Sequence, residues 1–472
     1  MFMGDAGQDY SGGFAAVVAL STLQVVGYLL GAVFFGRYLR RSKALTIPEF
    51  FGRRFCSPAM HKLAAITAII TMTVYLLSVI QGIGTLMNAV TGADYNLCIV
   101  LALIVFTFVT VTAGSGGVLI TDTLMAGFFT LALVASVFCI AHATGGWFGS
   151  IQTIVQTPSL SDLLSWSGRP GVLYNTGLEN MAFALIYGIV WMSVCMVGPW
   201  QSSIYLMAKN EHTVIRSSIP TAFFTFFLAF LVGMIAVFIN IANPALDNST
   251  HVLIWGAMNL MPKLLGVLLL TGVLAAGISS AMTFQSLIGS TMANDIIASS
   301  MKHRIRVGRI TMVVAGVIVL FVALFNPPSI FWIMYLGGAI VAASWMPVAI
   351  ASMTSRRLTR SGAFAGMLTG FLCCFFLRLW SALSGVTLPI YLDPSLVGMV
   401  ANIIIMIVVS ALTRVSPEEK AEFDALRVMP EEEMDPGEMK RTLRWTKSGA
   451  LLGIAIGLAM MALWAIPYTI FS

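Results

Sequence analysis

The sequence predicts an all-α membrane protein that crosses the bilayer about twelve times, as a single domain over residues 1–472. Apolar residues make up 58% of the chain and charged residues only 10%, whereas a soluble domain averages about 25% charged residues. The mean hydropathy is +0.91. The apolar residues form continuous runs and do not alternate with polar ones, which argues against a β-barrel. Runs of about 20 residues per crossing leave no room for a separate soluble enzyme domain.

Twelve apolar runs are candidates for crossing the hydrocarbon core of a bilayer. We expect spans at residues 14–35, 63–90, 97–112, 118–141, 181–207, 219–241, 264–297, 310–325, 330–353, 363–377, 397–412 and 450–470. Lys and Arg gather on every second connection between these spans. Those connections hold 23 of the 26 basic residues, within residues 37–62, 209–216, 302–309, 356–360 and 414–447.

Because Lys and Arg accumulate on the cytoplasmic side of a membrane protein, these connections predict the orientation of the chain. We expect a multi-pass protein of the cell membrane with both termini on the extracytoplasmic side. The connection at residues 414–447 carries nine acidic and seven basic residues, which predicts a solvated cytoplasmic linker before the last span. The basic charge follows the connections, so we expect the lipid bilayer and no nucleic acid as a partner. Nothing indicates an oligomeric state.

The seventh expected span carries a row of polar side chains through its apolar run. Gaps of four, three, four and four residues place the row on one face of a helix. Its members are Ser279, Thr283, Ser286, Ser290 and Asn294. Helix packing is one interpretation, because Ser and Thr let transmembrane helices approach and hydrogen-bond. A cation path is the other, because hydroxyl and carbonyl oxygens suit a hard cation such as sodium.

The fifth expected span is interrupted by a glycine and a proline, and polar residues follow before the apolar run resumes. The segment is Gly198, Pro199, Trp200, Gln201 and Ser202. Proline removes a backbone donor and clashes with the preceding turn. A broken helix in a membrane is tolerated where it lines a cavity, which makes such a break a pointer to a transport site. An ordinary proline kink is the alternative.

Two acidic residues lie in or near the expected spans. Asp122 lies one helical turn inside the cytoplasmic end of the fourth span. An ionisable residue at that depth is a functional candidate, although it can also cap the helix or reach interfacial water. Asp295 lies at the cytoplasmic edge of the seventh span, and we interpret it as interfacial.

Metal-site and enzyme signatures are missing from the sequence. The five histidines are scattered, and the six cysteines have no CxxC spacing, so neither a zinc site nor a disulfide framework is indicated. No GxSxG, HExxH or Walker-type motif occurs. We therefore expect no enzyme activity and no organic cofactor.

Five segments, in order along the chain, resemble motifs of the sodium:solute symporter family. They are residues 45–55 (LTIPEFFGRRF), 116–122 (GGVLITD), 275–280 (AAGISS) continuing to 294–296 (NDI), 307–309 (VGR) and 360–367 (RSGAFAGM). The resemblance implies a five-plus-five inverted-repeat transporter fold with extra C-terminal helices. In that fold the broken fifth span and the seventh span both belong to the second repeat.

The resemblance also implies roles for particular residues. In the family, sodium lies between the first core helix and the helix that matches the seventh span. Carried over by position, Ala276 offers its backbone carbonyl, and Ser279 and Ser280 offer their hydroxyls. Asp122 and Thr283 then lie on the sodium exit path. Sodium is the coupling ion under this interpretation.

The sequence departs from the family pattern in several places. Met125 stands where the family usually has Gln, and Ile204 where it frequently has Arg. Met282 replaces the first hydroxyl of a second sodium site, so we expect a single ion. Segment 4–13 resembles only the tail of the first core helix, and the helix before it is missing as well. We therefore expect an N-terminally incomplete member, from a start placed downstream or a partial sequence; in-frame stop codons just upstream of Met1 would contradict this.

These observations predict a secondary transporter that uses a sodium gradient to import a small polar solute by alternating access. Candidate solute-lining residues are Gln81, Trp200, Gln201 and Ser202. None of them forms a charge pair that would select a carboxylate, an amino acid, a sugar or a vitamin. A proton-coupled transporter of the same fold, with Asp122 as the carrier, and a transport-inactive membrane sensor or interaction protein are the alternatives.

Overall fold

A computed structural model describes the chain except residues 1, 173, 298–300, 326–329 and 387. Helices and their connections account for the described residues, with no strand among them. Within that part of the chain, twelve helices are long and apolar enough to cross a membrane. Each of the twelve overlaps one expected span, which confirms the all-α, twelve-span prediction. Most of the observed boundaries lie a few residues outside the predicted ones.

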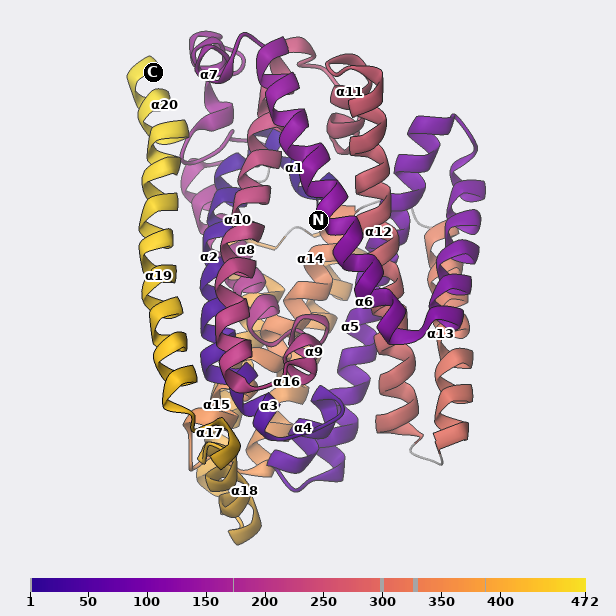
Figure 1. Cartoon of the computed structure of the whole chain (residues 1–472), viewed down its shortest axis with the longest axis vertical. Coiled ribbons are helices and arrows are strands. Elements are labelled where there is room, and N and C mark those ends of the chain that lie inside the picture. Colours follow the sequence, from indigo (N-terminus) through magenta and orange to yellow (C-terminus); the bar gives the residue numbers. More distant parts are fainter. Residues whose placement is uncertain (1, 173, 298–300, 326–329, 387) are drawn as a thin grey trace.

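The helices follow one another along the chain as a bundle (Figure 1). The first part comprises α1 (Phe2–Gln8), η1 (Asp9–Gly13), α2 (Phe14–Gly31), η2 (Ala32–Gly36), α3 (Arg37–Arg41), α4 (Ile47–Arg54), α5 (Pro58–Thr91) and α6 (Tyr95–Ala143). The middle part comprises α7 (Trp147–Gln156), η3 (Ser161–Leu164), α8 (Gly177–Val197), α9 (Pro199–Met207), α10 (Glu211–Ala242), η4 (Ser249–His251), α11 (Val252–Asn259), α12 (Lys263–Thr291), η5 (Met292–Ile296) and α13 (Met301–Phe325). The last part comprises α14 (Ile330–Ile340), η6 (Val341–Trp345), α15 (Met346–Thr354), α16 (Arg360–Ser384), η7 (Ile390–Leu392), α17 (Pro394–Leu412), α18 (Pro417–Arg427), η8 (Glu431–Glu433), α19 (Pro436–Met460), η9 (Met461–Ala465) and α20 (Ile466–Phe471).

Local capping signals in the sequence set several helix ends. The Ser57 hydroxyl accepts the Met60 backbone N–H at the start of α5, where a proline occupies the first helical position. Gly92 ends α5 in the left-handed conformation, with φ of 69°. At the start of α8, Thr176 and Glu179 cap each other reciprocally. These ends require no tertiary contact and are readable from the sequence.

Helix α6 carries two candidate spans and bends sharply between them. Thr107, in its first half, accepts a hydrogen bond from Gln285 of α12 at 2.9 Å. Asp122, in its second half, accepts one from Ser279 of the same helix. In a straight helix Thr107 and Asp122 would lie about 22 Å apart along the axis. Their partners on α12, Gln285 and Ser279, are six residues apart, which is only about 9 Å. The α6 chain therefore folds back against α12, as expected for two separate spans, although its backbone hydrogen bonding is helical throughout.

The predicted break in the fifth span is present. Helix α8 ends at Val197, Gly198 adopts φ −56° and ψ 137°, and α9 begins at Pro199. A Cβ atom on Gly198 would lie 2.5 Å from the carbonyl oxygen of Val194, so a side chain there would force the backbone to shift. The break therefore depends on glycine as much as on proline, and it separates two helices rather than bending one.

Residues 414–447, which we expected to form a solvated linker, are largely helical and partly docked. Helix α18 lies beneath the bundle in Figure 1, and α19 begins at Pro436, well before the expected start of the last span. Arg54 of α4 donates to the Ser352 carbonyl at 2.8 Å and to the Glu419 carbonyl at 3.2 Å. The Glu419 carboxylate in turn accepts the Arg360 backbone N–H at 2.6 Å. Most residues of the segment are exposed, and its docking was not readable from the sequence because composition reports charge but not which charges find partners.

Arg54 provides a test of this docking. Its side chain is buried, and burial lowers the pKa of the guanidinium to about 10, so it stays charged at neutral pH. Replacing Arg54 with Gln should lower the free energy of unfolding by about 2–3 kcal/mol, because two buried carbonyls lose a charged donor. Arg356→Gln removes an exposed ion pair to Asp424 of α18. This change should cost at most about 1 kcal/mol. Thermal unfolding of the purified full-length variants measures both; equal shifts would contradict the docking.

Candidate functional site

A cavity of about 270 Å³ lies beside the helix break, between α5, α9 and α12. Its lining residues are Met3, Tyr75, Ser78, Val79, Gly82, Ile83, Leu86, Trp200, Gln201, Val273, Ala276, Gly277, Ser280, Phe284 and Ile330. None of these described lining residues carries a charged side chain. Cavities of this kind, mostly apolar with a few polar groups, are typical of small-molecule sites. The volume is at the lower end for such sites, which suits a small ligand.

Three aromatic rings from three helices meet at one part of the cavity wall. The ring centroids of Tyr75 and Trp200 are 4.9 Å apart, those of Tyr75 and Phe284 4.8 Å, and those of Trp200 and Phe284 5.3 Å. Such distances fall in the favourable range for aromatic pairs. On α5 and α12, Tyr75 and Phe284 are the lining residues nearest to the helix end that adjoins a Lys- and Arg-rich connection. The trio therefore closes the cavity toward the side predicted to be cytoplasmic.

Two of the three predicted sodium ligands line this cavity. Ala276 and Ser280 lie on the face of α12 that contributes to its wall. The Ser280 hydroxyl donates to the Ala276 carbonyl at 2.9 Å, so the two oxygens lie side by side with acceptor lone pairs available for a cation. Sequence reasoning thus selected positions that the fold brings to the edge of a solute-sized space.

The third predicted ligand, Ser279, is turned toward α6. Its hydroxyl donates to the Asp122 carboxylate, and Thr283, one turn further along α12, donates to the other Asp122 oxygen at 3.4 Å. Asp122 is half-buried. Beside the oxygens of Ala276 and Ser280, two other hydroxyls of α12 thus hold the carboxylate of Asp122, which belongs to α6. The predicted exit-path pair, Asp122 and Thr283, is in contact in the structure.

The predicted solute-lining residues divide into two groups. Trp200 and Gln201 line the cavity, and the Gln201 amide donates to the Tyr28 hydroxyl at 3.2 Å. Gln81 and Ser202 are fully buried and are not among the lining residues. Sequence reasoning missed Tyr75 and Phe284, because an aromatic residue inside an apolar run carries no signal that distinguishes a cavity wall from ordinary core.

Three buried acidic residues were also missed or misjudged. Asp295 is buried rather than interfacial: its carboxylate accepts from the Thr46 hydroxyl at 2.6 Å and lies 2.9 Å from the His61 ring nitrogen. Near the cavity, Asp5 accepts from the Tyr187 hydroxyl at 3.1 Å, and Asp9 is fully buried. Within the described residues neither oxygen of the Asp9 carboxylate has a hydrogen-bond partner. Asp295 ties α12 to the α4 and α5 region.

The arrangement defines a class of protein. A helical bundle in which a broken helix and a row of hydroxyls border a solute-sized cavity at the middle of the spans is the architecture of a secondary transporter. The sodium:solute symporter family model matches residues 1–370. The chain therefore belongs to that family, which confirms the resemblance seen in the sequence and places the chain among transporters rather than enzymes.

Curated relatives share modest identity with the chain. The sodium/proline symporter of Salmonella typhimurium is 26% identical over 352 residues, which cover 70% of this chain and 66% of the relative. The sodium/proline symporter of Staphylococcus aureus is 22% identical over 452 residues, covering 88% of this chain and 82% of the relative. The match to the Salmonella protein thus spans about two thirds of its length.

Solved structures share the fold. A Na⁺-coupled sialic acid symporter in a substrate-bound outward-open state superposes with a TM-score of 0.71 at 17% identity, covering 88% of this chain and 87% of that one. A nucleobase-cation-symport-1 family transporter gives a TM-score of 0.54 at 15% identity, covering 90% and 92%. These likenesses confirm the predicted transporter fold.

The cavity itself can be tested without knowing its ligand. A Cβ on Gly82 would have only ordinary contact with Ile330, at 3.8 Å, so a longer side chain there would extend into the cavity. In a background without the native cysteines, Ser280→Cys should react with a small water-soluble thiol reagent. Gly82→Leu should slow that reaction about tenfold, whereas Gly127→Leu, at an exposed α6 position with open space, should not. Equal labelling rates in both variants would contradict the assigned cavity.

Proposed function

We propose that this protein imports a small polar solute by alternating access, driven by an inward sodium gradient. The observation that carries the proposal is the shared use of α12. Ala276 and Ser280 line the cavity, while Ser279 and Thr283 on the same helix contact Asp122. Oxygen ligands for a hard cation and a site for a solute are therefore within one helical turn of each other. Membership of the sodium:solute symporter family supports sodium as the coupling ion.

Coupling follows from linkage between the two sites. If sodium bound at Ala276, Ser279 and Ser280 stabilises the arrangement of α12 that also forms the solute cavity, each ligand raises the affinity for the other by the same factor. Solute then binds from the sodium-rich side and leaves where sodium dissociates. Thr283 of α12 and Asp122 of α6 provide the neighbouring oxygens, which makes them the proposed exit path for the ion.

The proposed solute is small and carries no net charge. The described lining residues include no charged side chain, so an ion would gain no pairing from them, whereas Ser78, Gln201 and Ser280 offer hydrogen bonds to a polar molecule. The amino-terminal end of α9 adjoins the same wall and favours a carboxylate group. A zwitterionic amino acid satisfies these conditions. Because the curated relatives are named sodium/proline symporters, proline is the first solute to test.

The multi-pass protein is proposed to lie in the cell membrane with both termini outside. This orientation rests on the uneven distribution of Lys and Arg between alternate connections. It places the aromatic trio and the docked α18 on the cytoplasmic side. Solute and sodium would then enter from the opposite side of the cavity.

Sodium coordination is tested by removing single hydroxyls. Ser279→Ala or Ser280→Ala should raise the sodium concentration for half-maximal uptake of radiolabelled proline into proteoliposomes about tenfold or more, because a ligand to a charged group contributes about 1.5–3 kcal/mol. Ser290→Ala is the matched control: its hydroxyl lies on the same row but donates to the Leu287 carbonyl. Unchanged sodium dependence in both Ser279→Ala and Ser280→Ala would remove the assigned ion site. Competition by a panel of unlabelled amino acids would establish the solute if proline is not transported.

Proton coupling is the second candidate, favoured by the carboxylate of Asp122 between two hydroxyls. The Asp122→Asn variant distinguishes sodium coupling from proton coupling. Under sodium coupling, the variant should keep sodium-dependent uptake at a reduced rate, because the exit path loses a charge but keeps oxygens. Under proton coupling, uptake should follow an imposed pH gradient in the parent protein without sodium and disappear in Asp122→Asn. Uptake that persists unchanged in sodium-free medium would contradict the proposed function.

A further inference from the structure

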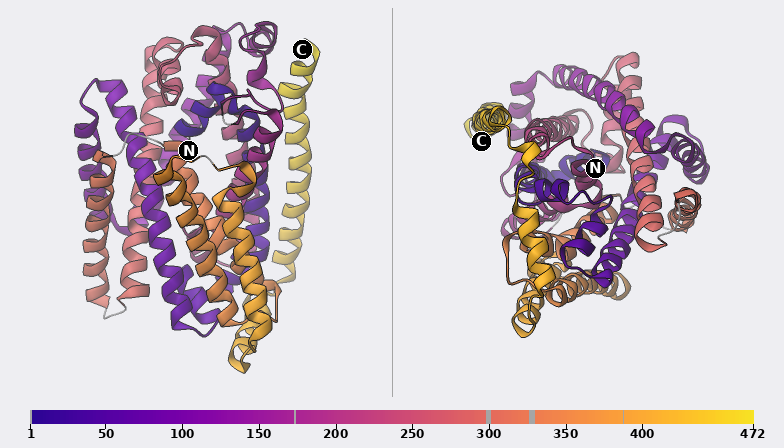
Figure 2. Two further views of the ribbon diagram at one scale, coloured as in Figure 1. Left: turned by 180° about the vertical axis from the view of Figure 1, so that it is seen from behind. Right: turned by 60° about the horizontal axis from the view of Figure 1, so that its bottom comes forward.

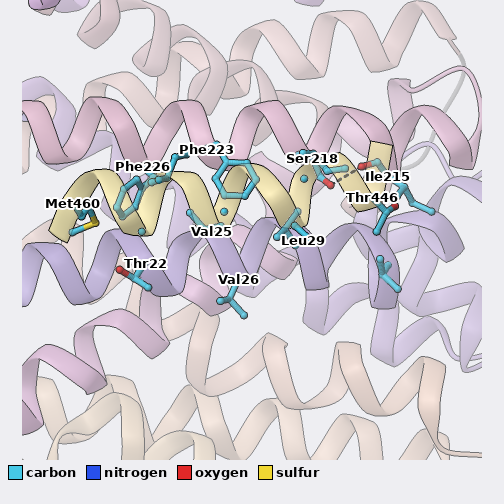
Figure 3. A pocket seen from close by; sticks show the side chains of 17 residues that line it. Thr22, Val25, Val26, Leu29, Ile215, Ser218, Phe223, Phe226, Thr446 and Met460 are labelled. Carbon is cyan, nitrogen blue, oxygen red and sulfur yellow. Dashed lines mark hydrogen bonds between the residues drawn. The ribbon is translucent and has the colours of Figure 1, made fainter. Parts of the chain in front are cut away.

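A second and larger cavity, of about 470 Å³, lies between α2, α10 and α19 (Figure 3). It runs along three helices that are each long and apolar enough to cross the membrane, so it is an intramembrane groove. Of its described lining residues, only Thr22, Ser218 and Thr446 are polar, and none is charged. Figure 3 shows Met460, Phe226 and Thr22 at one end and Ile215, Ser218 and Thr446 at the other. We call this cavity the α19 groove.

Helix α19 lies along the edge of the bundle (Figures 1 and 2) and is fixed to it near both ends. Near its start, Thr442 is 3.1 Å from a ring nitrogen of His212, and Glu438 forms an ion pair with Arg216 at 2.6 Å. Beyond its end, Trp464 is buried, donates to the Leu164 carbonyl at 3.2 Å and packs edge-on against Phe14 at 5.1 Å. The space between these attachments is therefore held open by specific contacts.

Three of the α19 residues that line the groove are glycines spaced four residues apart. A Cβ on Gly449 would lie 2.9 Å from Ile219, one on Gly453 would lie 3.3 Å from Phe223, and one on Gly457 would meet no atom within 4 Å. The groove therefore widens along α19. Apolar walls around an unfilled space lose their dispersion contacts, and within a bilayer the material that supplies them is a hydrocarbon chain.

The narrow end of the groove is surrounded by positive charge. Arg37 lies one helical turn beyond the lining residue Val33, and Lys447 directly follows the lining residue Thr446. The Nε of Arg37 is buried and has no hydrogen-bond partner in the described structure, and the same holds for Nη1 of Arg216. Buried guanidinium N–H groups without an acceptor call for an anion, since leaving them unpaired is costly.

Two acidic residues at this end form ion pairs, and a third, Glu433, accepts the Glu211 backbone N–H at 3.0 Å. Glu211 forms an ion pair with Arg41, and Glu438 pairs with Arg216 at 2.6 Å and with Arg441 at 3.7 Å. The remaining basic groups, including Arg37 and Lys447, therefore leave an excess of positive charge. Basic pockets between transmembrane helices at the cytoplasmic end are suited to anionic lipid headgroups.

We propose that the α19 groove binds one anionic phospholipid, with an acyl chain between α2, α10 and α19 and its phosphate near Arg37, Arg216 and Lys447. From Thr446 to Met460 the groove follows 14 residues of helix, about 21 Å. One leaflet contributes about half of the roughly 30 Å hydrocarbon core, so the groove has room for a whole acyl chain. The lipid would fill the space between the last transmembrane helix, α2 and α10 where the glycines of α19 present no side chain.

Native mass spectrometry of the delipidated full-length protein tests the proposal. Palmitoyl-oleoyl phosphatidylglycerol and palmitoyl-oleoyl phosphatidylcholine carry the same acyl chains and differ in headgroup charge. We expect one phosphatidylglycerol per chain, bound more tightly than phosphatidylcholine. Arg37→Gln combined with Lys447→Gln should weaken phosphatidylglycerol binding about thirtyfold, at about 1 kcal/mol for each basic residue near the surface. Neither residue makes a recorded contact that attaches α19, so the groove should persist.

Matched controls separate the groove from general effects. Gly457→Leu should abolish the bound lipid by filling the groove, whereas Ala455→Leu, at an exposed position outside its lining, should retain it. Arg306→Gln combined with Arg309→Gln makes the same charge change at another basic connection and should leave binding unchanged. Equal affinity for the two lipids, or retention of phosphatidylglycerol by both the Arg37 and Lys447 double variant and Gly457→Leu, would overturn the proposal. Uptake of solute is not needed for this test, so its outcome is independent of the proposed transport function.

Discussion

The need to satisfy backbone polar groups away from water constrains every part of this fold. In hydrocarbon an unpaired N–H or C=O group is costly, so a transmembrane segment can be irregular only where protein or an internal cavity surrounds it. The break between α8 and α9 meets this condition. The Gly198 N–H donates to the Val194 carbonyl at 2.8 Å, and its own carbonyl accepts from Ser202 at 2.8 Å. The chain thus changes direction while both backbone groups of Gly198 keep hydrogen-bond partners, and the turn presents Trp200 and Gln201 to the cavity.

The same constraint explains why α12 carries so much of the site. A helix satisfies its own backbone, so its side-chain hydroxyls are free to find partners on neighbouring helices. The fold-back of α6 supplies one: it brings Asp122 to Ser279 and Thr283, while Ser280 and Ala276 turn toward the cavity. Ser279 and Thr283 of the polar row therefore face α6, whereas Ala276 and Ser280, which lie outside that row, face the cavity.

The sequence predicted features that depend on local chemistry and on long apolar runs. The order of residues in the sequence was enough to predict three features: the twelve spans, the break at Gly198 and Pro199, and Asp122 as a candidate residue. The aromatic trio did not, because whether Tyr75 or Phe284 faces core or cavity depends on helices far away in the sequence. The docking of Glu419 onto Arg54 and the burial of Asp295 against Thr46 and His61 were missed for the same reason. The aromatic trio, the docking of Glu419 and the burial of Asp295 all depend on tertiary contacts, and the composition of the sequence does not reveal which residues make such contacts.

In the proposed cycle, α12 must shift relative to α5, because the cavity lies between them and has to open first to one side and then to the other. Asp295, in η5 directly after α12, is hydrogen-bonded to Thr46, at the start of α4, and to His61, in the first turn of α5. Breaking such contacts leaves a buried carboxylate unsatisfied, which is costly. The Asp295 contacts therefore favour the arrangement seen here, and the free energy of binding sodium and solute has to exceed that preference for α12 to move. The proposed ion and solute sites on α12 are linked to the Asp295 contacts, because η5 continues α12 directly.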